Sequence, residues 1–284
     1  MGLGGYLTWT AAAKSIAASE PEANMKFLPV EYRGGSMWVV QNEIFDHSRD
    51  FVYDRGVDAK IVPLVLNDPR SNYCKNDTPH KATQRGDAHI IEQICEVYGV
   101  KAILKCHLDF RDGEVDHVKK LLANVPRPFV TIEPHSKTSY TPNRSYDFSK
   151  WQSIVDELSK KVCVVQVGKK DVCLLDNVID MTGKTTFVET AIVIGESALF
   201  LSTEGGLVHA ASTTNTPALV VMTGYQTRKM VEYPQNITVD ISSHGPCGLK
   251  VSCPDCVRDV NRHDWREILN IAENFLESKR SSRL

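Results

Sequence analysis

The second half of the chain alternates short apolar segments with longer segments of helical periodicity. The apolar segments are "FVTIEP", "VCVVQVG", "ALFLS" and "PALVVM". Strands that are apolar on both faces are typical of parallel sheets covered by helices. This alternation predicts an α/β fold in which ligands bind beyond the carboxyl ends of the strands. After the first strand we expect a helix over "FSKWQSIVDELSKK", with Ser149 as its cap.

The first half shows similar elements in a less regular order. Strands are predicted over "MKFLPVEY", "MWVVQ" and "KIVPLVL", and one helix over "DAHIIEQICEVYGV". Prolines at 126 and 128 break the pattern, so we predict two domains, residues 1–126 and residues 127–284. The amphipathic segment at about 264–279 predicts a last helix, and one arrangement open to it is packing back onto the first domain.

Composition argues against two classes of function. The 284 residues carry a formal net charge of −2 and no long basic block, which argues against a nucleic-acid surface. No segment approaches the roughly 18 uninterrupted apolar residues of a transmembrane helix. The N-terminal residues do not resemble a secretory signal, so the eight cysteines indicate reduced thiols or metal ligands. We expect a cytoplasmic protein, with peripheral attachment at the inner face of a membrane as an alternative.

One segment of the second half has the pattern of a phosphate-binding turn. In "ALFLSTEGGLVHAAS" a buried strand leads into Gly205 and Gly206, and a helix is predicted from about Leu207. Unpaired backbone N–H groups and the helix dipole attract anions to such a helix start. Glu204 and His209 flank the turn. An alternative is a glycine-rich helix entry that binds no ligand.

Five segments occur in an order that resembles a known family. They are "IEPHSK", "PNRSYDFSKWQSIVDEL", "VVQVGKKD", "DMTGKTTFVETAIVIGESALFLSTEGGLVHAAS" and "TPALVVMTG". Together they resemble the C-terminal nucleotide-sugar-binding domain of the ADP-heptose:lipopolysaccharide heptosyltransferases, glycosyltransferase family nine. In the first half, "GLGGYLTWTAAAKSI" resembles the N-terminal "GLGD" loop and helix of the same family.

This resemblance implies a GT-B architecture, in which two Rossmann-like domains with parallel sheets face a central cleft. It also implies inverting transfer of a sugar from a nucleotide-diphosphate donor, ADP-heptose or similar. The acceptor would be a glycan, a lipid-linked molecule or a protein, and no cofactor would be required for transfer. Helix N-termini and cationic side chains can stabilise the leaving diphosphate without a metal.

The resemblance assigns a donor-binding role to a set of residues in both halves. Glu204 stands where the family usually has Asp, and Arg144 stands near a basic phosphate contact that is usually Lys. Arginine is compatible with that role because its guanidinium can bind two oxygens at once. The full set is Gly4, Gly5, His135, Lys137, Arg144, Gly168, Glu204, Gly205, Gly206 and His209.

The chain departs from the family at Gly5, where the family has the aspartate presumed to be the catalytic base. Glycine cannot accept a proton, so another acid of the first half must act, and the candidates are Glu43, Asp46 and Asp50. The alternative is a catalytically silent protein that binds sugar nucleotides or glycans.

The segment "HGPCGLKVSCPDC" has the spacing of a metal site. Cys253 and Cys256 form a C-x-x-C pair, and His244 and Cys247 can complete a tetrahedron around structural zinc or iron. Some relatives in the family, the protein heptosyltransferases that act on autotransporters, have a cysteine finger in this region. Two alternatives are a loop of reduced cysteines and a metal-fingered subunit of a homo-oligomer.

Overall fold

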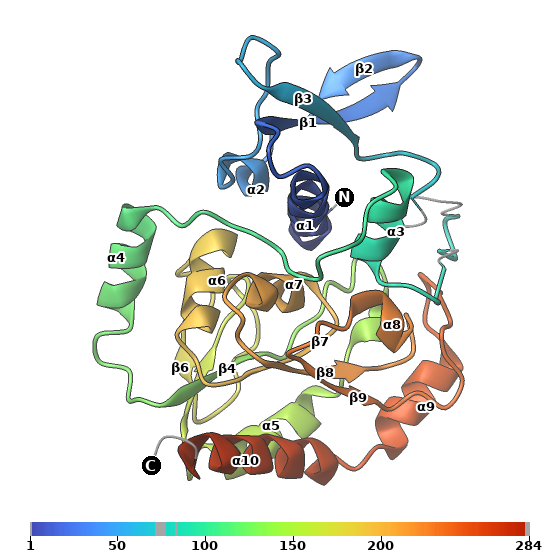
Figure 1. Cartoon of the computed structure of the whole chain (residues 1–284). Coiled ribbons are helices and arrows are strands. Elements are labelled where there is room, and N and C mark those ends of the chain that lie inside the picture. Colours follow the sequence, from blue (N-terminus) through green and yellow to red (C-terminus); the bar gives the residue numbers. More distant parts are fainter. Residues whose placement is uncertain (1, 72–77, 83–84, 282–284) are drawn as a thin grey trace.

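The second half forms the larger of two sheets in the computed structural model, which describes residues 2–71, 78–82 and 85–281. All six strands are parallel, in the order β6-β5-β4-β7-β8-β9 (Figure 1). This confirms the predicted sheet. The strands are β4 (Phe129–Glu133), β5 (Cys163–Gln166), β6 (Ile179–Asp180), β7 (Phe200–Thr203), β8 (Ala218–Met222) and β9 (Ile237–Asp240).

The first half contains a sheet of three strands, in the order β2-β1-β3. The strands are β1 (Met25–Arg33), β2 (Ser36–Val39) and β3 (Lys60–Val65). Strands β1 and β3 are parallel, whereas β1 and β2 form an antiparallel hairpin, so the prediction of a parallel sheet was wrong here. Gly34 and Gly35 have φ values of 57° and 80°, which suit the two-residue turn of a hairpin.

Helix α1 lies between the two sheets and joins the halves (Figure 1). It packs on α3 of the first half and on α7 of the second. One continuous apolar core includes Leu7 of α1 together with Phe200 and Leu207 of the second half. The helices of the first half are α1 (Leu3–Ser19), α2 (Glu43–Asp46), α3 (Ile90–Val97) and α4 (Asp112–Leu121).

The helices of the second half cover both faces of the large sheet. They are α5 (Phe148–Leu158), α6 (Phe187–Gly195), α7 (Gly206–Thr213), α8 (Arg228–Val231), α9 (Pro254–Arg262) and α10 (Arg266–Ser281). Helix α5 is capped by Asp147, whose side chain accepts from the N–H groups of Ser149 and Lys150. The prediction that Ser149 is the cap was therefore wrong by two residues.

The last helix packs within the second half. The buried residues Ile268, Leu269 and Ala272 of α10 belong to the same core cluster as Trp151 of α5. Helix α10 therefore covers the face of the large sheet that is turned away from α1 (Figure 1). Packing back onto the first domain, which the sequence left open, does not occur. The boundary near residue 126 remains our interpretation of the two sheets.

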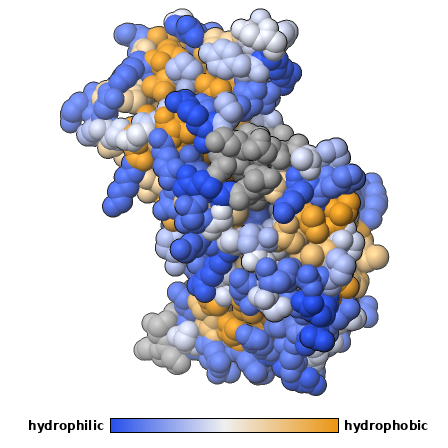
Figure 2. All heavy atoms as spheres, turned by 90° about the vertical axis from the view of Figure 1, so that its right-hand side faces the viewer, coloured by the Kyte–Doolittle hydropathy of each residue, from blue (hydrophilic) through white to orange (hydrophobic). Residues whose placement is uncertain are grey.

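Seen from the side, the molecule has a smaller upper lobe, which contains the three-stranded sheet, above a larger lower part (Figures 1 and 2). Among the described residues, none of the helices has the length and apolar character needed to cross a bilayer.

Candidate functional site

The N-terminal ends of α1 and α7 touch through two glycines. A Cβ atom added to Gly4 would lie 2.5 Å from the Cα atom of Gly206 and 3.1 Å from the His209 ring. Only glycine at position 4 permits this approach. Helix α7 begins at Gly206, one residue before the predicted start. The positive ends of two helix dipoles, one from each half, therefore meet at one place, which suits an anion.

Gly205 and Gly206 differ from Gly4 in the space around them. A Cβ atom at this position would point toward Gly4 and Phe187, each about 3.5 Å away. A Cβ atom at Gly205, in contrast, would meet only the Thr203 carbonyl oxygen, at 3.9 Å. These are ordinary contact distances, so a small side chain fits at position 206 and only position 4 requires glycine, whereas Gly205 has open space beside it.

Arg144, which is half-buried, pairs with the buried Glu204 beside this helix start. Glu204 follows β7 and is 2% exposed, and Arg144 ends a 3-10 turn at Pro142–Arg144. The Arg144 Nε atom lies 3.4 Å from Glu204 Oε1, an ion-pair distance without hydrogen-bond geometry. Neither carboxylate oxygen of Glu204, nor Arg144 Nε, has a hydrogen-bond partner among the described residues. Buried polar atoms without partners are rare, and a ligand, an ion or ordered water usually supplies the missing bonds.

Burial and the neighbouring guanidinium together determine the protonation of the Glu204 carboxyl. Burial raises the pKa of Glu204 to about 7, and the positive charge of Arg144 opposes that rise. The Arg144 guanidinium stacks over Tyr225 at 4.6 Å from the ring centroid and donates to Gln226 Oε1 at 3.2 Å. These contacts fix the plane of the guanidinium and leave its Nε edge beside Glu204. The arrangement suits recognition of a phosphate and a hydroxyl group side by side.

His209 occupies the first turn of α7 and is 8% exposed. A hydrogen bond of 2.6 Å joins its Nδ1 atom to the hydroxyl of Tyr233. Burial lowers the pKa of His209 to about 3, with smaller contributions from His89 and Arg144. The imidazole is therefore neutral near pH 7, and its other ring edge lies toward Gly4.

The other donor-site candidates lie at the carboxyl ends of β4 and β5. His135 stacks on Phe148, and a 2.8 Å hydrogen bond joins its Nε2 atom to the Cys173 carbonyl. Lys137 is exposed in the same loop. Gly168 has a φ of 133°, a conformation that L side chains rarely adopt, and it lies beside Glu133. Burial raises the pKa of Glu133 to about 8, and Lys169 opposes that rise.

The three candidate bases lie around α2 and its following loop. Asp50 pairs with Lys14 at 2.6 Å. Lys14 lies about 15 Å along α1 from Gly4 by helical rise, so this pair is remote from the glycine contact. Asp46 accepts a hydrogen bond from Tyr53 Oη, and Glu43 is exposed at the start of α2.

Glu31 is a fourth candidate base in the first half, and the sequence pattern did not single it out. It lies near the carboxyl end of β1, where Arg33 donates to it at 2.6 Å. Burial raises the pKa of Tyr6, and the negative charge of Glu31 raises it further. Glu31 is thus electrostatically close to Tyr6, which is in the first turn and a half of α1. The signal in the sequence that could have identified Glu31 was its position near the end of a predicted strand, at the edge of the predicted cleft.

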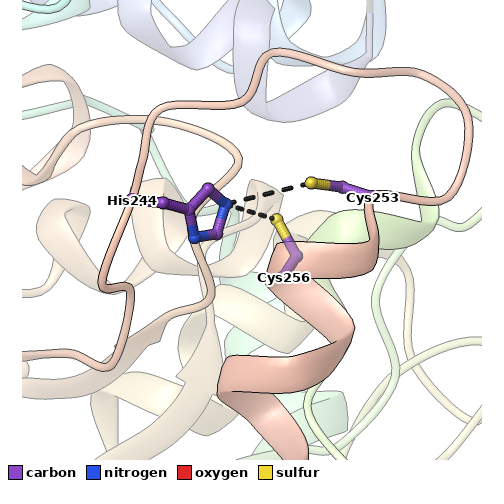
Figure 3. Close-up of side chains that lie close together, drawn as sticks. All are labelled: His244, Cys253 and Cys256. Carbon is purple, nitrogen blue, oxygen red and sulfur yellow. Dashed lines mark hydrogen bonds between the residues drawn. The ribbon is translucent and has the colours of Figure 1, made fainter.

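The four residues of the predicted metal site come together. The distances from His244 Nε2 to the sulfur atoms of Cys256 and Cys253 are 3.5 Å and 3.9 Å (Figure 3). The sulfur atoms of Cys256 and Cys247 are 3.5 Å apart. A tetrahedral zinc site with ordinary bond lengths has ligand–ligand distances of about 3.5–3.8 Å. The donor atoms of His244, Cys253 and Cys256 lie within 4.8 Å of one another, close to the spacing that such an ion requires, and Cys247 lies at the edge of this group, in contact with Cys256.

Asp259 supports this cluster from behind, and the sequence analysis missed it. Its Oδ2 atom lies 2.9 Å from His244 Nδ1 and accepts from the N–H and hydroxyl groups of Ser243. These hydrogen bonds hold the pKa of Asp259 below its usual range. A carboxylate on Nδ1 fixes the tautomer that leaves Nε2 free to bind a metal. Cys256 lies in the first turn of α9, and its hydrogen bond with Cys247 raises the pKa of the Cys256 thiol and lowers that of Cys247 to about 6.

The loop between Cys247 and Cys253 also touches the Arg144 region. Asn143 Nδ2 donates to the carbonyl groups of Leu249 and Val251, at 2.8 Å each. The Cys253 N–H donates to Asn143 Oδ1 at 2.9 Å. Asn143 directly precedes Arg144, so the cysteine loop and the donor-site candidate share one anchor.

Comparison with known proteins was informative at the level of fold. No protein-family model and no curated protein sequence matches the chain. Three solved structures superimpose on 98% of it. The glycosyl transferase family 9 protein of Veillonella parvula has a TM-score of 0.67 at 11% identity, with 95% of that chain covered. The iron-containing dodecameric glycosyltransferase TibC of enterotoxigenic E. coli has a TM-score of 0.66 at 13% identity, with 74% covered.

The third structure is E. coli ADP-heptose lipopolysaccharide heptosyltransferase II, with a TM-score of 0.62, 11% identity and 97% of that chain covered. The chain has the fold of these glycosyltransferases. The GT-B prediction is therefore confirmed as a fold, and the likeness extends over both halves, although the sequence motifs were concentrated in the second.

Proposed function

We propose that this protein is an inverting glycosyltransferase with a nucleotide-diphosphate sugar as donor. The single observation that carries the proposal is the pair Arg144 and Glu204, in which Arg144 Nε and both carboxylate oxygens of Glu204 are buried and lack hydrogen-bond partners among the described residues. The pair lies at a helix N-terminus, where a diphosphate is stabilised. Arg144 then binds phosphate oxygens, and Glu204 accepts a hydrogen bond from a hydroxyl of the sugar.

The reaction needs two kinds of help from the protein. The acceptor oxygen bonds to the anomeric carbon while the bond from that carbon to the diphosphate oxygen breaks. The nucleoside diphosphate leaves with the electron pair, and Arg144 and the α7 N-terminus stabilise its charge. A carboxylate of the first half takes the proton of the acceptor hydroxyl. For this base we propose Glu43, Asp46 or Glu31 ahead of Asp50, whose partner Lys14 lies about 15 Å along α1 from Gly4.

ADP-heptose is the first donor to test, since a TibC structure is described in complex with ADP-D-beta-D-heptose. The assay offers ADP-, UDP- and GDP-sugars with labelled sugar, and follows the label into glycan, lipid and protein fractions. We expect transfer from at least one donor and its loss in Arg144→Gln. Tight binding of a sugar nucleotide without transfer from any donor favours the catalytically silent binding protein. That alternative is based on Gly5, which is buried and stands where the family has its presumed catalytic aspartate.

Single substitutions identify the base. Replacement of Glu31, Glu43 and Asp46 by the corresponding amide is expected to lower turnover about 10²–10⁴-fold in one variant. That variant should keep the donor affinity of the wild type. Wild-type turnover in all three variants would remove these acids from the mechanism.

We also propose that His244, Cys247, Cys253 and Cys256 hold a structural zinc or iron ion. The spacing of the donor atoms and the Asp259 carboxylate behind His244 support it. TibC is described as iron-containing and dodecameric. When bound, the ion would cross-link the loop that anchors Asn143, and it would take no part in transfer.

A further inference from the structure

His89 is a buried histidine of the first half with one ring nitrogen unaccounted for. It caps α3 and is 2% exposed. The Ile91 N–H donates to its Nδ1 atom at 3.1 Å, so Nδ1 is the acceptor nitrogen and the proton of the neutral ring is on Nε2. Nε2 has no hydrogen-bond partner among the described residues.

The ring is directed at the second half of the molecule. Nδ1 and Nε2 lie on opposite sides of an imidazole, and Nδ1 is turned back onto α3. The His89 ring meets the Tyr233 ring edge-on at 5.0 Å, and Tyr233 is hydrogen-bonded to His209. A positive charge on His89 would lower the pKa of His209, so the two rings are within electrostatic reach of one another. His89 thus reaches the first turn of α7 from the other half of the molecule.

The chemistry of this nitrogen favours an anionic oxygen as its partner. Burial lowers the pKa of His89 to about 4, so the ring is a neutral donor near pH 7. A buried N–H without an acceptor costs about 1–3 kcal/mol, and a bond to a charged oxygen offsets that cost. The α7 N-terminus and Arg144 attract an anion to the same region.

We propose that the His89 Nε2–H group donates a hydrogen bond to the diphosphate of the sugar-nucleotide donor. This deepens the proposed function and rests on it. The donor would then be held from both halves, by His89 of the first and by Arg144 and α7 of the second. Binding of the diphosphate would draw the two halves together at this point.

Two substitutions separate this role from capping. His89→Asn keeps a side-chain acceptor for the Ile91 N–H and removes the distal donor. His89→Gln places an amide nitrogen near the Nε2 position and weakens the cap. Calorimetry with ADP, UDP and GDP identifies the nucleotide that binds most tightly to the wild type. We expect about a 10-fold or greater loss of that affinity in His89→Asn, and less than about a 3-fold loss in His89→Gln.

A spectroscopic measurement on the wild type gives a readout that a purely structural role would not move. In ¹⁵N-labelled protein, saturating nucleoside diphosphate should shift the His89 Nε2–H resonance and slow its exchange. Unchanged affinity in folded His89→Asn, or an unchanged resonance at saturation, overturns the assignment and leaves the proposed function standing. Failure of the wild type to bind any of the three nucleotides overturns both.

Discussion

Two polar clusters of the second half satisfy their hydrogen bonds in opposite ways. Around Glu204, buried polar atoms lack partners among the described residues. Around His244, the described donor atoms lie within contact of one another, and Asp259 bonds the remaining ring nitrogen. The first cluster suits a ligand that brings its own hydroxyl and phosphate groups. The second suits a single ion, and the difference predicts opposite responses to removal of one polar group.

Loss of one sulfur ligand should give the largest effect. Cys253→Ser is expected to release most of the metal and to lower the melting temperature strongly, because metal binding at such sites is coupled to folding. Elemental analysis and thermal unfolding check this prediction. Cys173→Ser, at an exposed cysteine, is the matched control and should change neither quantity. Protein prepared without chelator that contains no zinc or iron contradicts the metal site.

At Glu204, removal of the charge by Glu204→Gln should stabilise the protein instead of destabilising it. The folded pKa of about 7 lies above the unfolded value, so the folded state holds the proton longer as pH rises. Wild-type stability from this group is therefore full below about pH 4.5, is lost up to about pH 7, and then levels off. Relative to wild type, Glu204→Gln should gain roughly 3 kcal/mol over this range. Denaturant unfolding as a function of pH measures the difference.

The same variant should bind its sugar nucleotide less tightly, by about 10-fold, with little change for the nucleoside diphosphate alone. Glu133→Gln is the control, because its carboxyl is also raised in pKa and ends a neighbouring strand. Glu133→Gln should gain stability as Glu204→Gln does, and it should keep the wild-type affinity for the sugar nucleotide. Lower stability of Glu204→Gln at pH 8 would show that the carboxylate already has a partner.

The fold was readable from the sequence because apolar strands and helical periodicity are local signals. The strand before Glu204 and the helix start near Gly206 followed from them, as did the convergence of Cys253 and Cys256 from a C-x-x-C pair. Features that depend on distant contacts were missed. Position 4 must be glycine only because α7 lies against α1, and Asp259 supports His244 across 15 residues.

The docking of α10 was also beyond the sequence. Its apolar stripe predicts burial but not the partner, and Trp151 and the rest of the α5 face decide that partner. Likewise, His89 looks like an ordinary cap in the sequence. Only the three-dimensional structure shows that its ring contacts Tyr233 of the other half and that Nε2 is buried without a hydrogen-bond partner among the described residues.

Asn143 links the two clusters, so its removal should affect both. Asn143→Ala breaks three hydrogen bonds to the cysteine loop and should lower stability by about 2–4 kcal/mol. Affinity for nucleoside diphosphate and for metal should fall together, as calorimetry and chelator competition can show. Lys137→Ala is the control for metal affinity. Lys137 is exposed, lies between β4 and α5 as Asn143 does, and its replacement should have little effect on metal binding. A loss of metal affinity alone would show that the clusters act independently.

The smallest effect is expected behind the metal cluster. Asp259→Asn removes the charge on the His244 ring and should weaken metal binding about 10–100-fold. Competition with a chelator of known affinity measures the change. Asp255→Asn is the matched control, since Asp255 is bonded to Arg258 on the same helix. Equal metal affinities in both variants would leave Asp259 without a role at the metal.

The most direct test is a crystal structure of the protein saturated with the nucleoside diphosphate that it binds most tightly. The account predicts phosphate oxygens within hydrogen-bond distance of the Arg144 guanidinium and the backbone N–H groups at the start of α7, with Glu204 facing the space for the sugar. A nucleotide bound elsewhere at full occupancy, with Arg144 Nε and the Glu204 carboxylate still without a hydrogen-bond partner, would contradict it.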